Sequence, residues 1–550
     1  MDPTLQLNSF LSRVSPRFRD HVQPIPPPKL AQPARLQRRQ AWRNERVLFR
    51  RPCDLCKRMV VSIYDGSTPF PVYCPQCWYS DAWDPYSYGQ TINFSQPFFS
   101  QLKALQDVVP RISLIHLGEM ENSDFTHDVM RLKDCYLIFD GEQSRNCAYG
   151  ETFYRLTDCY DFLELHNSEL CYECVACDEC YNLNFGLNCF QCSDSWFLRD
   201  CRGCRNCFAC ANLHQKEYYI FNKPHSADEF HRFLADFASE NLQQLDEWRE
   251  KAHEFWSNCP VRFMRGVQNE NVSGDYLANC KDVVESFNSN NLRDCGYCTN
   301  VVLGANDCWD IDVWGNGIEL CYDCTCIGEN VRECLFSLYV SQGAEKVCYS
   351  QFCSRQVRDL FGCIGLRRTS HAILNRRYSA QEYDELVSRL VKHMSETGEW
   401  GEFPPMEHSP FPYNFTVAQE YFPLTEEQVR SAKLHWEPPP DQSRSATEGI
   451  LTRDYDSPKA QAIDVVFRCE ASGRLFRFQR SELEFYERKN LPLPRLHPDV
   501  RHLHRMRLRN DRKLWRRTCS SCGTPITTTY RPDSTAAQVL CERCYQTAIN

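Results

Sequence analysis

Between residues 134 and 210, small apolar positions lie on one register of three residues: successive cysteines are separated by 3, 9 or 12 positions. Cysteine there is typically preceded by Asp, Asn or Glu and often followed by an aromatic residue, as in Asp134-Cys135-Tyr136 and Asn206-Cys207-Phe208. A polar residue can turn the backbone while the small thiol faces inward, so the pattern predicts a β-solenoid with about twelve residues per coil. The cysteines in this register are Cys135, Cys147, Cys159, Cys171, Cys174, Cys177, Cys180, Cys189, Cys192, Cys201, Cys204, Cys207 and Cys210.

The same unit occurs a second time further along the chain. Residues 159–174 match residues 308–324 with one residue inserted, and the ends of the two copies match at a constant offset of 153 residues. Each copy runs into a helix opened by a capping box, at Ser226 and at Ser379. The sequence therefore predicts a mainly β fold with helices, in which a duplicated cysteine-rich solenoid has each copy closed by a helix.

Two pairs of CxxC motifs lie near the ends of the chain. The spacing suits tetrahedral zinc, because each pair presents four thiolates and the residues between form a hairpin. We expect a zinc ribbon at each end and two structural zinc ions in all; a pair of disulfides is the alternative. Four thiolates fill the tetrahedral coordination of a zinc ion and leave no position for water or substrate, which disfavours a catalytic ion. The predicted ligands are Cys53, Cys56, Cys74 and Cys77, and Cys519, Cys522, Cys541 and Cys544.

The remaining cysteines admit other interpretations. Cys171 to Cys180 and Cys201 to Cys210 have a CxxCxxCxxC spacing that suggests iron–sulfur loops, but they lack the longer last gap and the proline of ferredoxins. In the second copy of the unit, Asn330 and Glu333 stand near the positions that later cysteines occupy in the first copy, which argues against iron–sulfur clusters. Packed free thiols are favoured over additional zinc and over clusters.

Charge is distributed unevenly along the 550 residues. Residues 1–58 carry 13 Lys/Arg against 4 Asp/Glu, whereas residues 134–210 carry 5 against 13. The chain has 34 cysteines, but the opening MDPTLQLNSF lacks the apolar core of a signal peptide, which favours a reducing cytoplasm. No apolar run is long enough to span a membrane.

The basic ends suggest nucleic-acid binding. Arginines alternate with apolar residues directly before the second pair of CxxC motifs, and the Pro- and Arg-rich N-terminal arm is similar to extensions that thread into RNA. RNA or a ribonucleoprotein is the partner that this pattern favours; the alternative is that these arginines cover the acidic solenoid of the protein itself. The predicted contacts are Arg501, Arg505, Arg507, Arg509, Arg512, Lys513, Trp515, Arg516 and Arg517.

Two further classes of function compete with nucleic-acid binding. A scaffold could use the solenoid faces to dock a partner, for example a basic protein. An iron–sulfur, redox or metal-dependent enzyme is disfavoured, because the sequence shows no nucleophile triad, glycine-rich phosphate loop or open metal site. The histidines show no ligand spacing beyond His502-x-His504, and no small-molecule substrate is indicated. A non-enzymatic, zinc-containing binding or scaffold protein is the function expected.

The segment after the proline-rich stretch resembles a family of zinc-ribbon domains. Its four ligand positions are taken by Cys469, Ser472, His497 and Val500. Valine cannot bind a metal and serine rarely does, so the resemblance implies a degenerate ribbon without zinc.

Over nearly its full length from about residue 50, the chain resembles an uncharacterised family of large cysteine-rich, zinc-ribbon-containing proteins predicted in candidate-phyla bacteria. The resemblance implies an architecture and a bacterial cytoplasmic setting, and no activity. It is carried by residues 80–86, 216–222, 397–403, 417–423 and 482–486 through Trp515.

These features divide the chain into eight parts. They are a basic arm (1–46), a zinc ribbon (47–90), a connecting segment (91–133), the first solenoid and helix (134–258), the second (259–400), a proline-rich linker (401–460), the degenerate ribbon (461–510) and a zinc ribbon (511–550).

Overall fold

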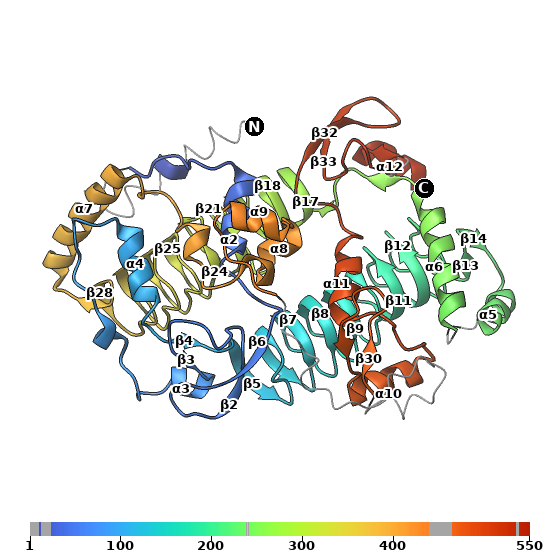
Figure 1. Ribbon diagram of the computed structural model, residues 1–550. Coiled ribbons are helices and arrows are strands. Elements are labelled where there is room, and N and C mark those ends of the chain that lie inside the picture. Colours follow the sequence, from blue (N-terminus) through green and yellow to red (C-terminus); the bar gives the residue numbers. More distant parts are fainter. Residues whose placement is uncertain are drawn as a thin grey trace.

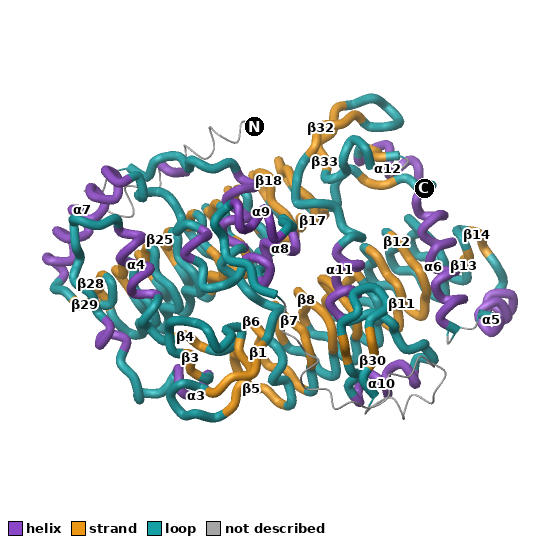
Figure 2. Tube along the Cα trace, viewed as in Figure 1, coloured by secondary structure: helices purple, strands orange, loops and turns teal. Residues whose placement is uncertain are grey.

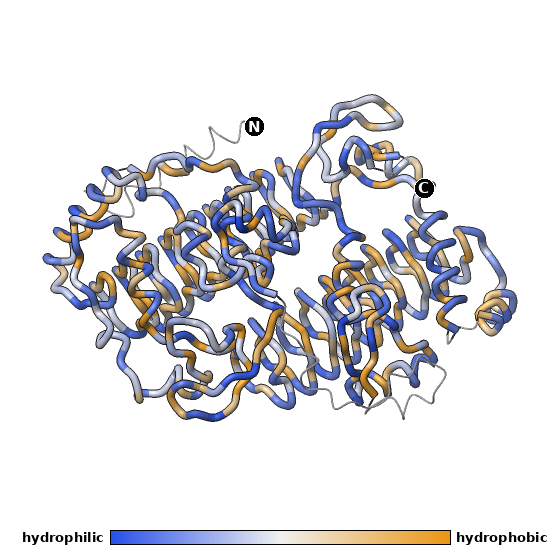
Figure 3. The backbone as a smooth tube through the Cα atoms, viewed as in Figure 1, coloured by the Kyte–Doolittle hydropathy of each residue, from blue (hydrophilic) through white to orange (hydrophobic). Residues whose placement is uncertain are grey.

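The protein combines sheets and helices around two long stacks of parallel strands, shown in the computed structural model (Figures 1 and 2). The structure describes residues 10–12, 24–237, 239, 241–438, 465–534 and 538–549. Hydrophobic and hydrophilic residues alternate along the backbone of both stacks and form no long hydrophobic block (Figure 3). Within the described residues, no helix is long and apolar enough to cross a membrane.

The first stack, called ladder 1, is an eight-stranded sheet whose strands neighbour each other in chain order. Its strands are parallel, and most partners lie twelve residues apart, as in Tyr136↔Ala148 and Ala148↔Tyr160. Its strands are β5 (His116–Glu121), β6 (His127–Lys133), β7 (Tyr136–Glu142), β8 (Ala148–Tyr154), β9 (Tyr160–His166), β10 (Val175–Asp178), β11 (Tyr181–Leu187) and β12 (Ser193–Arg199).

Ladder 1 begins earlier than residue 134, where the sequence analysis placed the boundary. Strands β5 and β6 belong to it, although they precede the first cysteine of the register. Val129 and Leu132 are buried in the same core cluster as Cys135, so aliphatic residues take the inward positions there. A register defined by cysteine alone could not detect these strands.

The three-residue register reflects a backbone that turns at every third residue. Asp134, Asp158 and Asn206, each just before a cysteine, have φ of 53°, 53° and 50°. Short polar side chains tolerate this left-handed conformation better than most. The thiols then face the core and donate hydrogen bonds to main-chain carbonyls: Cys171 Sγ lies 3.4 Å from the oxygen of Glu169. None of the cysteines, all of which lie in the described residues, forms a disulfide.

The second stack, called ladder 2, belongs to a twelve-stranded sheet. Partners between Leu292 and Phe361 lie thirteen residues apart, as in Arg332↔Glu345 and Glu345↔Arg358. Its strands are β16 (Gly266–Val267), β17 (Glu270–Ala278), β18 (Lys281–Asn290), β19 (Leu292–Gly296), β20 (Ala305–Asn306), β21 (Cys308–Trp309), β23 (Cys321–Tyr322), β25 (Arg332–Leu335), β26 (Glu345–Cys348), β27 (Arg358–Phe361), β28 (Ser370–Ile373) and β29 (Arg376–Arg377); β22 (Asp312–Gly315) pairs with β24 (Thr325–Gly328).

The expected spacing of twelve residues therefore does not describe ladder 2 between β19 and β27, and it returns between β27 and β28, where Arg358 pairs with Ser370. The additional residue is taken up at one corner, where two consecutive residues have positive φ. Glu329 and Asn330 have φ of 61° and 60°, and Arg355 and Gln356 have 62° and 61°. Because the same corner absorbs each insertion, the strands stay in register.

A short hairpin and a capped helix follow each ladder. In ladder 1 the hairpin β13–β14 (Tyr219–Ile220, Lys223–Pro224) leads into α5 (Ala227–Asp236), and α6 (Leu242–Ser257) follows. In ladder 2, β28 and β29 lead into α7 (Ala380–Thr397). Both α5 and α7 begin with the expected capping box.

Removing the cap of α7 should weaken the end of ladder 2. The Ser379 hydroxyl accepts a hydrogen bond from the Glu382 amide at 3.2 Å. We expect Ser379→Ala to lower the free energy of unfolding by about 1 kcal/mol in denaturant titration, because it leaves that amide without its partner. Ser388→Ala, in the middle of the same helix, is the control and should not destabilise, because alanine is the better helix former. Equal effects of both changes would refute the role of the cap.

The segment predicted as a proline-rich linker contains short helices up to residue 438. They are η2 (Met406–His408), η3 (Tyr413–Phe415), α8 (Val417–Tyr421) and α9 (Glu426–Ser431). Tyr413, Ala418 and Val429 are buried against Ala41 of the N-terminal segment. The prolines thus separate short packed elements; the rest of the predicted linker, residues 439–460, lies outside the described residues.

Candidate metal centres

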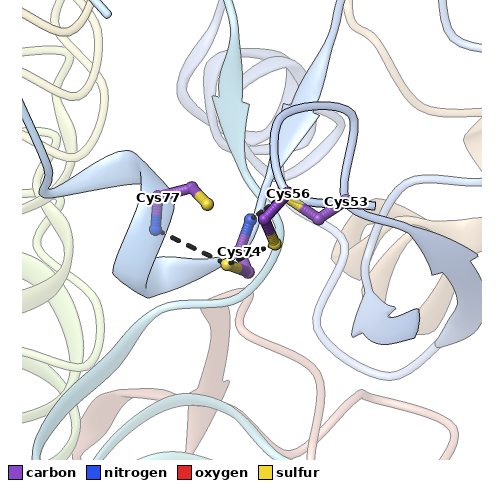
Figure 4. A group of neighbouring side chains, drawn as sticks. All are labelled: Cys53, Cys56, Cys74 and Cys77. Carbon is purple, nitrogen blue, oxygen red and sulfur yellow. Dashed lines mark hydrogen bonds between the residues drawn. The ribbon is translucent and has the colours of Figure 1, made fainter. Parts of the chain in front are cut away.

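Four cysteines near the N-terminus converge in space, as Figure 4 shows. Strands β1 (Phe49–Pro52) and β2 (Met59–Ser62) form an antiparallel hairpin whose turn carries Cys53 and Cys56. Cys74 and Cys77 lie at the start of α3 (Pro75–Trp78), directly after β3 (Val72–Tyr73). The four Sγ atoms all lie within 4.8 Å of one another.

Backbone amides point at these sulfur atoms. The Cys74 amide donates to Cys53 Sγ at 3.2 Å, and the Cys77 amide donates to Cys74 Sγ at 3.5 Å. A hydrogen bond from Arg58 lowers the pKa of Cys56 to about 6. The amide donors and the low pKa of Cys56 favour thiolates, the form that binds zinc, whereas burial raises the pKa of Cys74 and of Cys77.

The C-terminal tetrad has the same construction. Hairpin β32–β33 (Trp515–Thr518, Pro525–Thr528) carries Cys519 and Cys522, and β34 (Val539–Leu540) leads through Cys541 into α12 (Glu542–Ile549), which contains Cys544. The Cys541 amide donates to Cys519 Sγ at 3.3 Å, and the four sulfur atoms again lie within 4.8 Å of one another. A hydrogen bond with Thr524 lowers the pKa of Cys522 to about 6. Both tetrads could hold a zinc ion.

Each tetrad is joined to the strand that precedes a ladder. β3 pairs in parallel with β4 (Arg111–Ile112), through Val72↔Arg111, and β5 of ladder 1 follows. β34 pairs in parallel with β15 (Val261–Arg262), through Val261↔Val539, and β16 of ladder 2 follows. The two tetrads thus occupy equivalent places, although they lie at opposite ends of the sequence.

Two of the predicted nucleic-acid contacts are buried inside the protein. Arg501 and Arg505 lie on α11 (Pro498–Met506), are 3% and 1% exposed, and both pair with Asp161 of β9. Arg505 also donates to the carbonyl oxygen of Tyr149 at 3.1 Å. These guanidiniums neutralise an aspartate of ladder 1 and are not available to a phosphate.

Two more predicted contacts lie between the ladders. Arg509 pairs with Glu164 of ladder 1. Arg512 donates to Asn300 at 3.1 Å, and its guanidinium lies 3.9 Å from the ring centre of Tyr421. The alternative interpretation, in which arginines cover the protein's own acidic surface, therefore describes Arg501, Arg505 and Arg509.

The other predicted contacts lie nearer the surface. Arg507, Lys513 and Arg516 are exposed, while Trp515 and Arg517 are half-buried. The Lys513 ammonium lies 4.3 Å from the Trp515 ring centre, and Arg517 donates to the carbonyl oxygen of Arg531 at 2.7 Å.

The N-terminal arm makes the same kind of contact with ladder 2. Arg35 and Arg39 on α2 (Gln32–Gln40) are buried, and both pair with Asp310, at 2.8 and 3.3 Å. Asp161 and Asp310 occupy matching places in the two sequence copies. Each ladder thus receives two arginines, four residues apart on one helix, at equivalent aspartates. The composition of the arm did not distinguish this role from RNA binding, although the matching aspartates were visible in the sequence.

The structure describes residues 465–510 of the segment predicted as a degenerate ribbon. Its elements are β30 (Phe467–Arg468), β31 (Leu475–Phe476), α10 (Arg480–Arg488) and α11. Cys469 accepts a hydrogen bond from the Ser472 amide at 3.4 Å. Among the described residues, Cys469 belongs to no group of three or more metal-binding side chains.

No protein-family model matches the chain, and no curated protein matches it at a significant level.

Proposed function

We propose that the protein is a non-enzymatic, zinc-containing scaffold. In this proposal the two ladders are β-solenoids, the two tetrads are structural zinc ribbons, and the chain works in a reducing cytoplasm, which fits cysteines that form no disulfide. The observation that carries the proposal is the parallel pairing of each tetrad's strand with the strand that precedes a ladder.

The zinc ribbons would act as caps. The end of a parallel stack exposes unpaired backbone groups, and stacked-repeat proteins need a cap there. β3 and β34 are only two residues long, too short to stay paired with β4 and β15 unless the rest of the ribbon holds them. A zinc ion in each tetrad would hold the ribbon together and thereby keep β3 or β34 in place.

The outer side of ladder 1 offers a regular surface for a protein partner. Residues at intervals of twelve form an exposed row along the stack: Glu169 is paired with Tyr181, and Arg205 with Glu217. Tyr181, in the middle of this row, is 47% exposed. Acidic and basic side chains flank the exposed ring of Tyr181. A surface that carries both signs of charge suits a protein partner better than a polyanion such as RNA.

A pull-down from the source cells, with and without nuclease, tests the partner class. We expect the recovered proteins to survive nuclease treatment, and to be lost with Tyr181→Ala, because the exposed ring supplies contact area. Met59→Ala, at another exposed hydrophobic residue (66%), is the matched control and should keep them. Recovery that disappears with nuclease, together with heparin retention abolished by Lys513→Gln, would instead support nucleic acid.

A further inference from the structure

A buried histidine and two glutamates meet where ladder 1 touches two other parts of the chain. Glu151 comes from β8, Glu420 from α8 and His502 from α11. His502 Nε2 lies 3.5 Å from Glu151 Oε2 and 3.4 Å from Glu420 Oε2. One ligand atom from each residue lies within 4.8 Å of the other two. Glu151 lies hundreds of positions before the other two residues, Glu420 and His502 are 82 positions apart, and the sequence gives no motif for the three.

The cluster holds buried polar atoms without hydrogen-bond partners. Glu151 and His502 are 3% and 1% exposed, and neither Glu151 Oε2 nor His502 Nδ1 makes a hydrogen bond. Glu151 Oε2 is the atom that faces His502 Nε2. A buried, unsatisfied carboxylate oxygen is costly, so a ligand at this point would stabilise the fold.

Arg46 is the cation nearest the cluster, and it does not satisfy the carboxylates. Its guanidinium lies 3.6 Å from both Glu151 and Glu420 and 3.8 Å from Asp499, beyond hydrogen-bonding distance. Asp499 has a closer partner in Arg474, at 2.7 Å. Glu151 and Glu420 therefore share Arg46 without a hydrogen bond to it. Arg43 also acts on both carboxylates, but its own ion pairs are with Glu45 and Asp312.

We propose that Glu151, Glu420 and His502 bind a divalent first-row transition-metal ion. A donor set of one imidazole and two carboxylates suits Mn²⁺, Fe²⁺ or Zn²⁺ and contrasts with the four thiolates of each tetrad. Three protein ligands leave coordination positions for water on the side of Glu420, whose side chain is 16% exposed. The bound ion would hold α8 and α11 against ladder 1. This site is independent of the proposed zinc caps.

Metal content and Co²⁺ spectroscopy of the full-length protein test this site. After equilibration with Co²⁺ and removal of excess, we expect about three ions per chain, of which about two show thiolate charge-transfer absorption and one does not. His502→Gln should lose only the ion without thiolate absorption. His504→Gln, on the same helix but outside the cluster, should keep all three.

The measurement on the wild-type protein decides the question even if His502→Gln fails to fold. About two ions per chain, all with thiolate absorption, would overturn the proposal. An unchanged third ion in a folded His502→Gln protein would also overturn it. Glu420→Gln offers a second variant, because its partly exposed side chain should tolerate the change, and it should weaken binding of the third ion at least tenfold.

Discussion

Cys74→Ser is expected to remove one zinc ion and to open the first strands of ladder 1, while ladder 2 stays protected. Cys74 begins α3, accepts a hydrogen bond from the Cys77 amide and directly follows β3, which pairs with β4. Structural zinc contributes about 10–16 kcal/mol in small zinc-dependent folds, so its loss should undo the module. Zinc analysis should fall from about two ions to one, and hydrogen exchange should accelerate in residues 110–133.

The second tetrad and a cysteine outside both provide matched controls. Cys541→Ser should instead accelerate exchange in residues 260–278, because β34 pairs with β15. Cys259→Ser, at a half-buried thiol outside both tetrads, should keep both ions. If Cys74→Ser and Cys541→Ser opened the same strands, or neither ladder, the capping role of the tetrads would be wrong.

Asp323→Asn is expected to destabilise the protein by about 3–5 kcal/mol, because it breaks a buried ion-pair network and leaves arginine charge uncompensated. Asp323 of ladder 2 is fully buried and pairs with Arg38, at 2.6 Å, and with Arg39. Burial would raise the pKa of Asp323, but Arg38 and Arg39 hold it below its usual value.

The depressed pKa fixes the sign of the pH dependence. The contribution of Asp323 is present above the unfolded pKa of about 4 and is lost as the pH falls through the lower folded value. Urea titrations at neutral and acidic pH should therefore show the largest deficit of Asp323→Asn at neutral pH. Asp194→Asn, at a partly exposed carboxylate on ladder 1, should cost less than about 1 kcal/mol. Equal costs of the two changes would show that the buried network does not hold the N-terminal helix.

Local sequence signals predicted much of the fold because they repeat. The turn before each cysteine needs a residue that tolerates positive φ, and Asp134 and Asp158 show it. The capping boxes at Ser226 and Ser379 are satisfied within a few residues, so their pattern was sufficient. The two cysteine tetrads were identified because each CxxC pair is compact in sequence.

The sequence pattern missed features in which other residues stand where cysteine was expected, or in which the spacing changes. Val129 and Leu132 extend ladder 1 without cysteine, and the insertions at Asn330 and Gln356 change the spacing of ladder 2. The arginines between 501 and 517 have the composition of a nucleic-acid-binding segment. Whether an arginine meets a phosphate or an aspartate such as Asp161 is decided by distant contacts.

The sequence by itself determined the local geometry: the turn at every third residue, the capped helices and the two sets of four cysteines. These follow from interactions between neighbouring residues. Tertiary structure alone decided that Arg39 and Arg505 point inward, that the strands before Cys74 and Cys541 pair with the strands that precede different ladders, and that Glu151 meets His502. Each of these joins segments far apart in the chain, where burial and charge pairing depend on how complete surfaces pack.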